Sequence, residues 1–215
     1  MAKKILLGVV AVLALFALVV AFQPAAYRVS RSTSIAAPPA VAYAQVADFH
    51  NWERWSPWAK IDPAMKTTYE GQPGAVGSSY YWTGDNKVGE GRMTISSIAP
   101  AQSVAIKLEF LRPFAATNAT RFGFAPEGGG TRVTWDMDGS KGGFVGKAFG
   151  LFMDFDKLVG GDFEKGLLQL KAVSEAEAQK AEAAQKAQQA AAAAAVQPAP
   201  AAGGAIQATA PAPVK

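Results

Sequence analysis

The chain has 215 residues, which is enough for one domain with extensions. Its 21 basic residues exceed its 17 acidic residues by only four and form no cluster, so nucleic-acid binding is not indicated. It contains no cysteine, which excludes disulfides, thiolate metal ligands and cysteine nucleophiles.

The chain begins with a strongly apolar run. Ile5 to Phe22 has no charged or hydrogen-bonding side chain, and as a helix it would be about 27 Å long, close to the ~30 Å hydrocarbon core of a bilayer. A cleavable signal within residues 1–26 is the alternative, although a signal's apolar region is usually shorter; a buried globular helix is another. We predict an uncleaved single-span anchor, with the domain on the outer side of the cytoplasmic membrane because Lys3 and Lys4 precede the span.

The next segment combines a strand with a helix and three tryptophans. Tyr27 to Ile35 is predicted to be a strand, and Pro38-Pro39 suits the first turn of a helix that continues to Phe49. The tryptophans that follow are Trp52, Trp55 and Trp58. They could line a cavity mouth or enter a membrane interface, where tryptophan is favoured, or they could fill the end of a sheet as core.

From residue 66 to residue 140 the apolar period is two, which predicts strands. The predicted strands are residues 66–70, 78–83, 88–98, 102–111, 117–125 and 131–138. Short turns between them predict an antiparallel meander, and Gly89, Gly91 and Gly123 indicate bends that curl it. Because each strand has one apolar face, the sheet needs a single cover.

Phe144 to Val173 is predicted to provide that cover as one amphipathic helix or two short ones. Its apolar residues recur in steps of three or four: Phe152, Phe155, Val159, Phe163, Leu167, Leu170 and Val173. Residues 174–215 are predicted to be a tail, helix-prone to Val196 with Ser174 and Glu177 as a capping box, and then disordered. The domain itself is predicted at residues 27–173.

This order of elements resembles the START-like (SRPBCC) superfamily, whose helix-grip fold is an α+β fold with a curved antiparallel sheet wrapped around a long C-terminal helix. The residues that carry the resemblance are Phe49, Trp52, Trp55 and Ser56-Pro57-Trp58, then Gly89-x-Gly91 with Met93 and Ile95, and finally Gly161 to Leu167. These segments are similar to the corresponding segments of the superfamily's bacterial polyketide-cyclase/dehydrase-like branch. The resemblance implies an apolar cavity under the C-terminal helix that binds lipids or polycyclic molecules; it does not fix a chemistry.

Few residues are candidates for catalysis. His50 is the single histidine, so a Ser-His-Asp triad with a spare base and a histidine metal cluster are excluded, and we expect a surface or capping histidine beside Asp48. Asp136 and Asp138 alternate with core residues and should point to solvent. Glu90 and Arg92 should likewise form an outer-face network. We assign no catalytic residue and expect no metal and no cofactor.

Asn118 and Thr120 are polar on a strand face that also carries Phe122 and Phe124. An inward polar group needs a partner, which a ligand head group or bound water could provide. The alternative is that this end of the strand is exposed.

We therefore predict a ligand site between the C-terminal helix and the sheet. Its expected lining is Trp55, Trp58, Trp82, Met93, Ile106, Leu108, Asn118, Thr120, Phe122, Trp135, Phe152, Phe155 and Val159.

Three functions remain open. The first is membrane-anchored binding or transport of a hydrophobic, lipid-like molecule. The second is a cyclase or dehydratase acting on an aromatic or polyketide substrate, which needs an acid or base facing the cavity. The third is an anchored interaction module, which a dry, filled interior would favour. The sequence does not indicate an oligomeric state.

Overall fold

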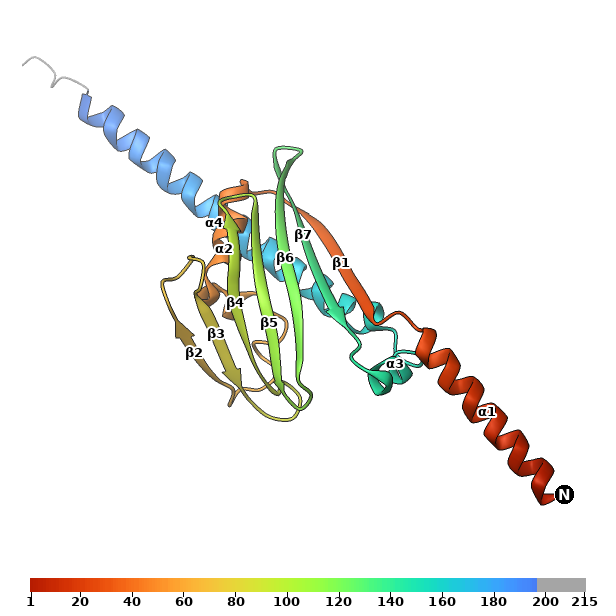
Figure 1. Cartoon of the computed structure of the whole chain (residues 1–215). Helices are drawn as coiled ribbons and strands as arrows, with labels where there is room; N and C mark the ends of the chain where they lie inside the picture. The colour runs from red at the N-terminus through yellow and green to blue at the C-terminus, as the bar shows by residue number, and fades with distance from the viewer. Residues whose placement is uncertain (197–215) are drawn as a thin grey trace, which may run out of the picture. The chain divides into compact units, whose positions relative to one another are not determined.

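A computed structural model describes residues 1–196 of the chain (Figure 1). The elements are α1 (Ala2–Phe22), β1 (Ala26–Ile35), α2 (Pro39–Ala47), the 3-10 helix η1 (Phe49–Arg54), β2 (Lys66–Glu70), β3 (Ser79–Thr83), β4 (Glu90–Ala99), β5 (Ser103–Arg112), β6 (Ala116–Glu127), β7 (Gly130–Ser140), α3 (Phe144–Phe149) and α4 (Phe155–Val196). Met1–Ala178 forms a compact unit, which is the part considered below. The predicted disorder at residues 197–215 lies outside the described residues.

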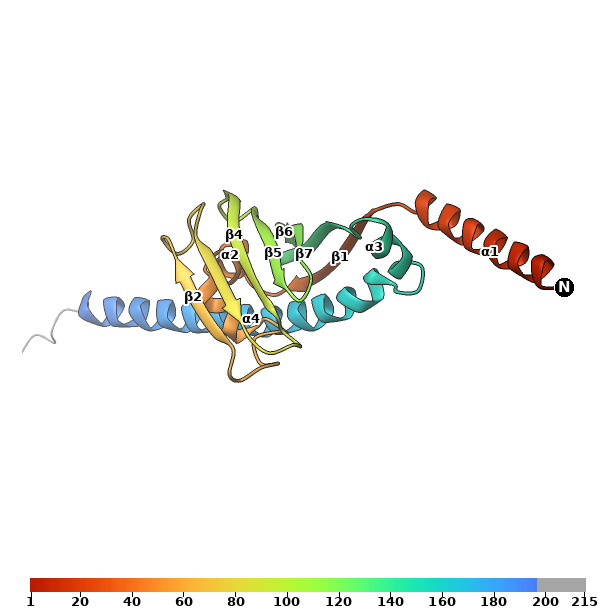
Figure 2. The same cartoon turned by 60° about the horizontal axis from the view of Figure 1, so that its bottom comes forward.

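The strands form one antiparallel sheet of seven, in the order β1-β7-β6-β5-β4-β3-β2. The predicted meander therefore runs from β2 to β7, and β1 completes the sheet by pairing along β7, from Ala26 opposite Ser140 to Ile35 opposite Thr131. Figures 1 and 2 show α2 and the beginning of α4 on the same face of this curved sheet. The predicted helix-grip architecture is confirmed.

The predicted cover is two helices with a break at residues 150–154. Asp154 Oδ1 accepts the backbone N–H groups of Asp156 (3.1 Å) and Lys157 (3.2 Å), which is how an N-cap residue starts a helix. Phe152 therefore lies outside α4 and is 81% exposed, so its predicted place in the apolar stripe is wrong. The rest of the stripe faces the sheet, with Phe163 and Leu167 buried and Val159 half-buried.

The predicted helix start at Ser174 is also wrong. Ser174 is fully buried inside α4, which continues to Val196, and its hydroxyl has no hydrogen-bond partner among the described groups. No glycine or proline follows Val173 until Pro198, so nothing in the sequence ends the helix there.

Ion pairs hold the first turns of α4 to β1. Arg31 binds Asp156 through two hydrogen bonds of 2.9 Å and Glu164 through one of 2.8 Å. Further along α4, Glu175 accepts the backbone N–H of Ala36 at 2.8 Å, and Lys171 donates to the Ser34 carbonyl at 2.7 Å. The pKa of the Asp156 carboxyl is lowered by its hydrogen bonds to Arg31, and that of Glu175 by the backbone N–H of Ala36.

Close contact between α4 and the sheet depends on Gly166. A Cβ atom at this buried position would lie 2.9 Å from Cζ3 of Trp135 and 3.1 Å from Cδ of Pro57. Trp135 is itself buried and has little room to move. At Gly161, also in α4, a Cβ atom would meet nothing within 4 Å.

We expect Gly166→Ala and Gly161→Ala to have opposite effects on the free energy of unfolding. Gly161→Ala should raise it by about 1 kcal/mol because alanine favours helix. Gly166→Ala should lower it by about 1–3 kcal/mol because the added methyl group forces the buried rings apart. Urea titration of the full chain in detergent micelles, followed by tryptophan fluorescence, measures both. Equal stabilisation by the two substitutions would show that the helix does not lie this close to Trp135.

Asp156→Asn should destabilise the fold at pH 7, and the difference from the wild type should shrink in acid. A carboxyl whose pKa is lowered in the folded state contributes stability above its unfolded pKa of about 4, and that stability is lost as the pH falls through the lower folded value. Urea midpoints at pH 7 and at about pH 2.5 test this. The matched control is Asp162→Asn, whose ion pair to Lys165 joins no two elements; an equal effect of both substitutions at pH 7 would contradict the role of the Arg31 contact.

Candidate site at the junction of the two C-terminal helices

The middle of the space between α4 and the sheet is filled by aromatic rings. Trp135 of β7 and Phe163 of α4 stack with ring centroids 3.9 Å apart and an angle of 8° between their planes. Trp58 meets both rings edge-on, and Trp55, which is fully buried, packs edge-on against Trp135 at 5.8 Å. The cavity that the resemblance implies is therefore occupied by side chains at this level.

The tryptophan segment is held in the core by its indole N–H groups. Trp52 donates to the carbonyl of Val46 at 2.9 Å, and Trp55 donates to that of Gln45 at 3.0 Å. Both acceptors belong to α2, so the end of that helix fixes the two rings. Trp52 and Trp55 are buried, which confirms their core interpretation and contradicts a place in a membrane interface; Trp58 is half-buried.

Asn118 and Thr120 are buried, so the alternative of an exposed strand end is wrong. Thr120 is satisfied within the protein, because its hydroxyl donates to the Asp136 carbonyl at 2.8 Å and accepts from Nε1 of Trp135 at 2.9 Å. Asn118 has weaker partners: its Oδ1 accepts from the Tyr27 hydroxyl at 3.4 Å, and its Nδ2 faces Sδ of Met137 at 3.7 Å.

The other predicted lining residues lie along the same face of the sheet. Trp82, Met93, Ile106 and Phe122 are buried in the shared core, and Leu108 packs against it. Trp82 also donates to the Val88 carbonyl at 3.1 Å. A ligand contact for these residues remains a prediction.

An open hollow of about 510 Å³ lies where the start of β1 meets the junction of α3 and α4. Its lining is Tyr27, Arg28, Lys141 and the continuous stretch from Gly150 to Asp156. Of the predicted residues, only Phe152 and Phe155 line this hollow. Val159 lies one turn further along α4.

The local backbone that forms this junction depends on two glycines. Gly142 has φ +77°, which favours glycine, and a Cβ atom at Gly146 would fall 1.4 Å from the carbonyl oxygen of Lys141. The chain can therefore turn sharply from β7 into α3. At Gly150 a Cβ atom would lie 2.7 Å from Cδ of Lys141, so the lysine stem lies against the end of α3 and borders the hollow.

The inner wall of the hollow is aromatic. Tyr27 stacks on Phe155 with ring centroids 5.0 Å apart, and its hydroxyl reaches Asn118 over Gly139, which has no side chain to block it. Burial raises the pKa of the Tyr27 hydroxyl. The wall therefore presents two rings with one neutral polar pair behind them.

Most charges around the hollow are already paired. Arg28 lies 3.3 Å from Asp136 and 3.7 Å from Asp138, Asp156 binds Arg31, and Asp154 caps α4. Lys141 is half-buried and has no carboxylate within ion-pair distance among the described residues. The hollow thus has two aromatic rings on its inner side, a mainly polar accessible surface, and one cation, Lys141, with no ion-pair partner among the described residues.

The family of the chain follows from residues 26–175, which match the family described as "Polyketide cyclase / dehydrase and lipid transport". The chain belongs to this family. The resemblance noted in the sequence is therefore confirmed. No curated protein matches the chain.

Solved structures show the same fold as this polyketide cyclase/dehydrase family member. Mll3558 from Rhizobium loti is 19% identical over 69% of this chain and 96% of its own, with a TM-score of 0.53. The Aha1 dimer from Colwellia psychrerythraea is 16% identical over 69% and 96%, with a TM-score of 0.50. The di-domain ARO/CYC StfQ from the steffimycin biosynthetic pathway is 12% identical over 72% and 52%, with a TM-score of 0.53. At these identities the likeness concerns the fold alone.

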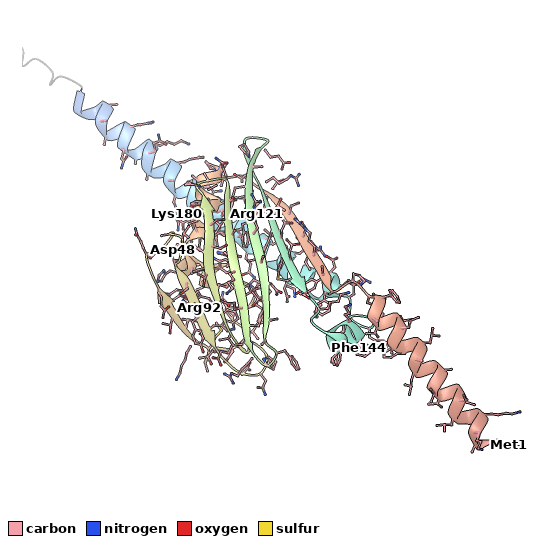
Figure 3. All side chains as sticks on the ribbon, viewed as in Figure 1. Met1, Asp48, Arg92, Arg121, Phe144 and Lys180 are labelled. Carbon is pink, nitrogen blue, oxygen red and sulfur yellow. The ribbon has the colours of Figure 1, made fainter. Side chains whose placement is uncertain are left out.

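None of the catalytic candidates of this family member lines the hollow, although Asp136 and Asp138 pair with Arg28, which does. His50 is a surface histidine that shares Asp48 with the cap of η1: its Nδ1 lies 2.7 Å from Asp48 Oδ1, and its ring stacks on Tyr69. Glu90 binds Tyr81 and Arg112, and Arg92, labelled in Figure 3, binds Glu70 at 3.1 Å. The prediction that Glu90 and Arg92 take part in polar networks on the outer face of the sheet is confirmed.

Thr120→Val should lower the free energy of unfolding by about 1–3 kcal/mol, because the buried indole N–H of Trp135 would lose its acceptor. The tryptophan fluorescence intensity at the long-wavelength edge of the emission band should also change. Thr134→Val is the control, since Thr134 lies in β7 on the other side of the sheet and is half-buried. Urea titration compares the two variants, and equal losses would show that the Thr120 hydroxyl is not needed by Trp135.

Proposed function

We propose that the chain binds an amphipathic, lipid-like molecule with an acidic head group in the hollow at the α3–α4 junction, beside a membrane in which α1 is anchored. Membership of the family supports a hydrophobic-ligand or cyclase role in general terms. The observation that carries the narrower proposal is the hollow itself, in which the unpaired Lys141 faces the same space as Tyr27, Phe152 and Phe155. Its volume lies in the range of small-molecule sites.

Each wall of the hollow would contact a different part of the ligand. Tyr27, Leu151, Met153 and Phe155 offer apolar surface to a hydrocarbon chain or ring system. A carboxylate or phosphate beside Lys141 would supply the counter-ion that no described residue supplies, and charge-assisted hydrogen bonds of this kind are stronger than neutral ones. A ligand without an acidic group would leave the lysine as it is and would gain only the apolar contacts.

A membrane position for the hollow is supported by α1. This helix is long and apolar enough to cross a bilayer, and its side chains are exposed almost throughout. A signal sequence would have the same character. As an anchor, α1 would place the hollow close to a source of lipid, with the domain on the outer side of the membrane.

The cyclase or dehydratase alternative needs an acid or base that faces the ligand. The two carboxylates at the hollow do not supply one freely: Asp156 is held by Arg31 with its pKa lowered, and Asp154 caps α4. A proton transfer there would therefore fall to Tyr27 or Lys141. The interaction module is the stronger competitor, because the filled middle of the domain fits it. A ligand that co-purifies with the chain would favour ligand binding over the interaction module.

Lys141→Gln should weaken the binding of a fluorescent long-chain fatty acid by a factor of about 10 to 100, because a charge-assisted hydrogen bond contributes about 1.5–3 kcal/mol. The titration uses the full chain in neutral detergent micelles, with empty micelles as the blank. Native mass spectrometry of the purified chain should also find a bound lipid-like molecule.

Lys165→Gln is the matched control, because Lys165 is exposed on α4 and pairs with Asp162 away from the hollow. Unchanged binding by both variants would remove Lys141 from the site. A wild-type chain that carries no ligand and binds no fatty acid would favour the interaction module.

A further inference from the structure

The surface that carries this inference is the apolar segment from Phe144 to Met153, which comprises α3 and the loop that follows it. No residue of α3 is buried. The large apolar side chains exposed in this segment are Phe144, Val145, Phe149, Phe152 and Met153. Val145, Phe149 and Phe152 are 68%, 61% and 81% exposed. Apolar groups that gather in this way on a surface usually mark an interaction site.

This segment lies at the end of α1. Lys147 of α3 donates from Nζ to the carbonyl of Ala21 at 3.1 Å, in the last turn of α1. Val20 is fully buried although it does not belong to the core of the domain, and α1 is in contact with α3. Figures 1 and 2 both show α3 beside the end of α1, and Figure 3 marks Phe144 there.

The short connector between α1 and β1 also keeps the domain close to the end of α1. Only Gln23, Pro24 and Ala25 separate α1 from β1, so Ala26 lies within about 14 Å of Phe22 along a fully extended chain. If α1 crosses a bilayer, its last apolar residue, Phe22, lies near the edge of the hydrocarbon. A segment held against Ala21 must then lie at the level of the head groups.

We propose that α3 and residues 150–153 are a membrane-contacting surface that inserts into the interface of the bilayer spanned by α1. The occupant of this apolar surface is lipid, because the helix that it contacts would itself be surrounded by lipid. The phenylalanines would lie at the boundary of the acyl chains, and Lys147, which bonds to the end of α1, would lie among the head groups. The proposal depends on α1 as a span and does not depend on ligand binding in the hollow.

The absence of cysteine allows a direct test with single labelled cysteines. Phe149→Cys, Phe152→Cys, Leu13→Cys and Thr68→Cys are each made in the full chain, labelled with a nitroxide and reconstituted into vesicles of phosphatidylcholine with phosphatidylglycerol. Leu13 reports on α1, and Thr68 is an exposed residue of β2, at the edge of the sheet opposite β1. Power saturation then compares collisions of each label with oxygen, which dissolves in lipid, and with a water-soluble nickel chelate.

The labels at 149 and 152 should show an oxygen-to-nickel ratio several-fold above that at 68 and below that at 13. A ratio at both positions equal to that at 68 would overturn the proposal, as would a water-exposed label at 13. Spin–spin broadening at 152 that disappears on dilution with unlabelled chain would identify a second copy as the occupant and would also overturn it. Because fatty-acid binding is measured in micelles, the two proposals can fail separately.

Discussion

The close approach of α4 to the sheet determines most of this structure. Gly166 lets the helix come near enough for Phe163 to stack on Trp135, and the same approach brings Pro57 against the helix. The rings of Trp55 and Trp58 complete the packing from the segment after α2. Ion pairs from Arg31 and contacts from Glu175 then fix the helix along β1. The apolar contact sets the depth of the helix, and the polar contacts at its sides set its position along the strand.

That packing has a consequence for ligand binding. With the middle of the domain occupied by rings, space remains where α4 begins, beside the start of β1. The hollow lies there, between Tyr27 and the loop from Gly150 to Asp154. Its inner wall is continuous with the core through Tyr27 and Asn118, so the site is attached to the rigid part of the fold even though it opens outward.

The fold could be read from the sequence because its signals are local. The alternation of Val104, Ile106 and Leu108 predicts a half-buried strand, and the spacing of Phe163, Leu167 and Leu170 predicts the covering face of a helix. The core role of Trp52 and Trp55 is one of three interpretations that the sequence leaves open, since periodicity does not say which backbone carbonyls their indole groups reach. The break before Phe155 had a signal in Asp154, a residue typical of helix N-caps, but the run of apolar residues around it was the more prominent pattern.

The hollow could not be predicted in the same way, because it depends on contacts between distant residues. Tyr27 and Asn118 are 91 positions apart, and Lys141 borders the hollow because Gly150 has no side chain. The number of rings that fit between a helix and a sheet depends on the distance between their backbones, and apolar periodicity does not give that distance. Phe152 shows the limit most clearly, since its spacing assigns it to the buried stripe and the turn at residues 150–154 turns it outward.

The three-residue connector between α1 and β1 limits what such a domain could do as a carrier. If α1 anchors the chain as proposed, the domain could not reach a second membrane, because only Gln23 to Ala25 join it to α1. Any hand-over of cargo would take place at the bilayer of residence, with the recipient arriving there. A longer connector would let the domain reach further from its membrane while every residue of the hollow stayed the same.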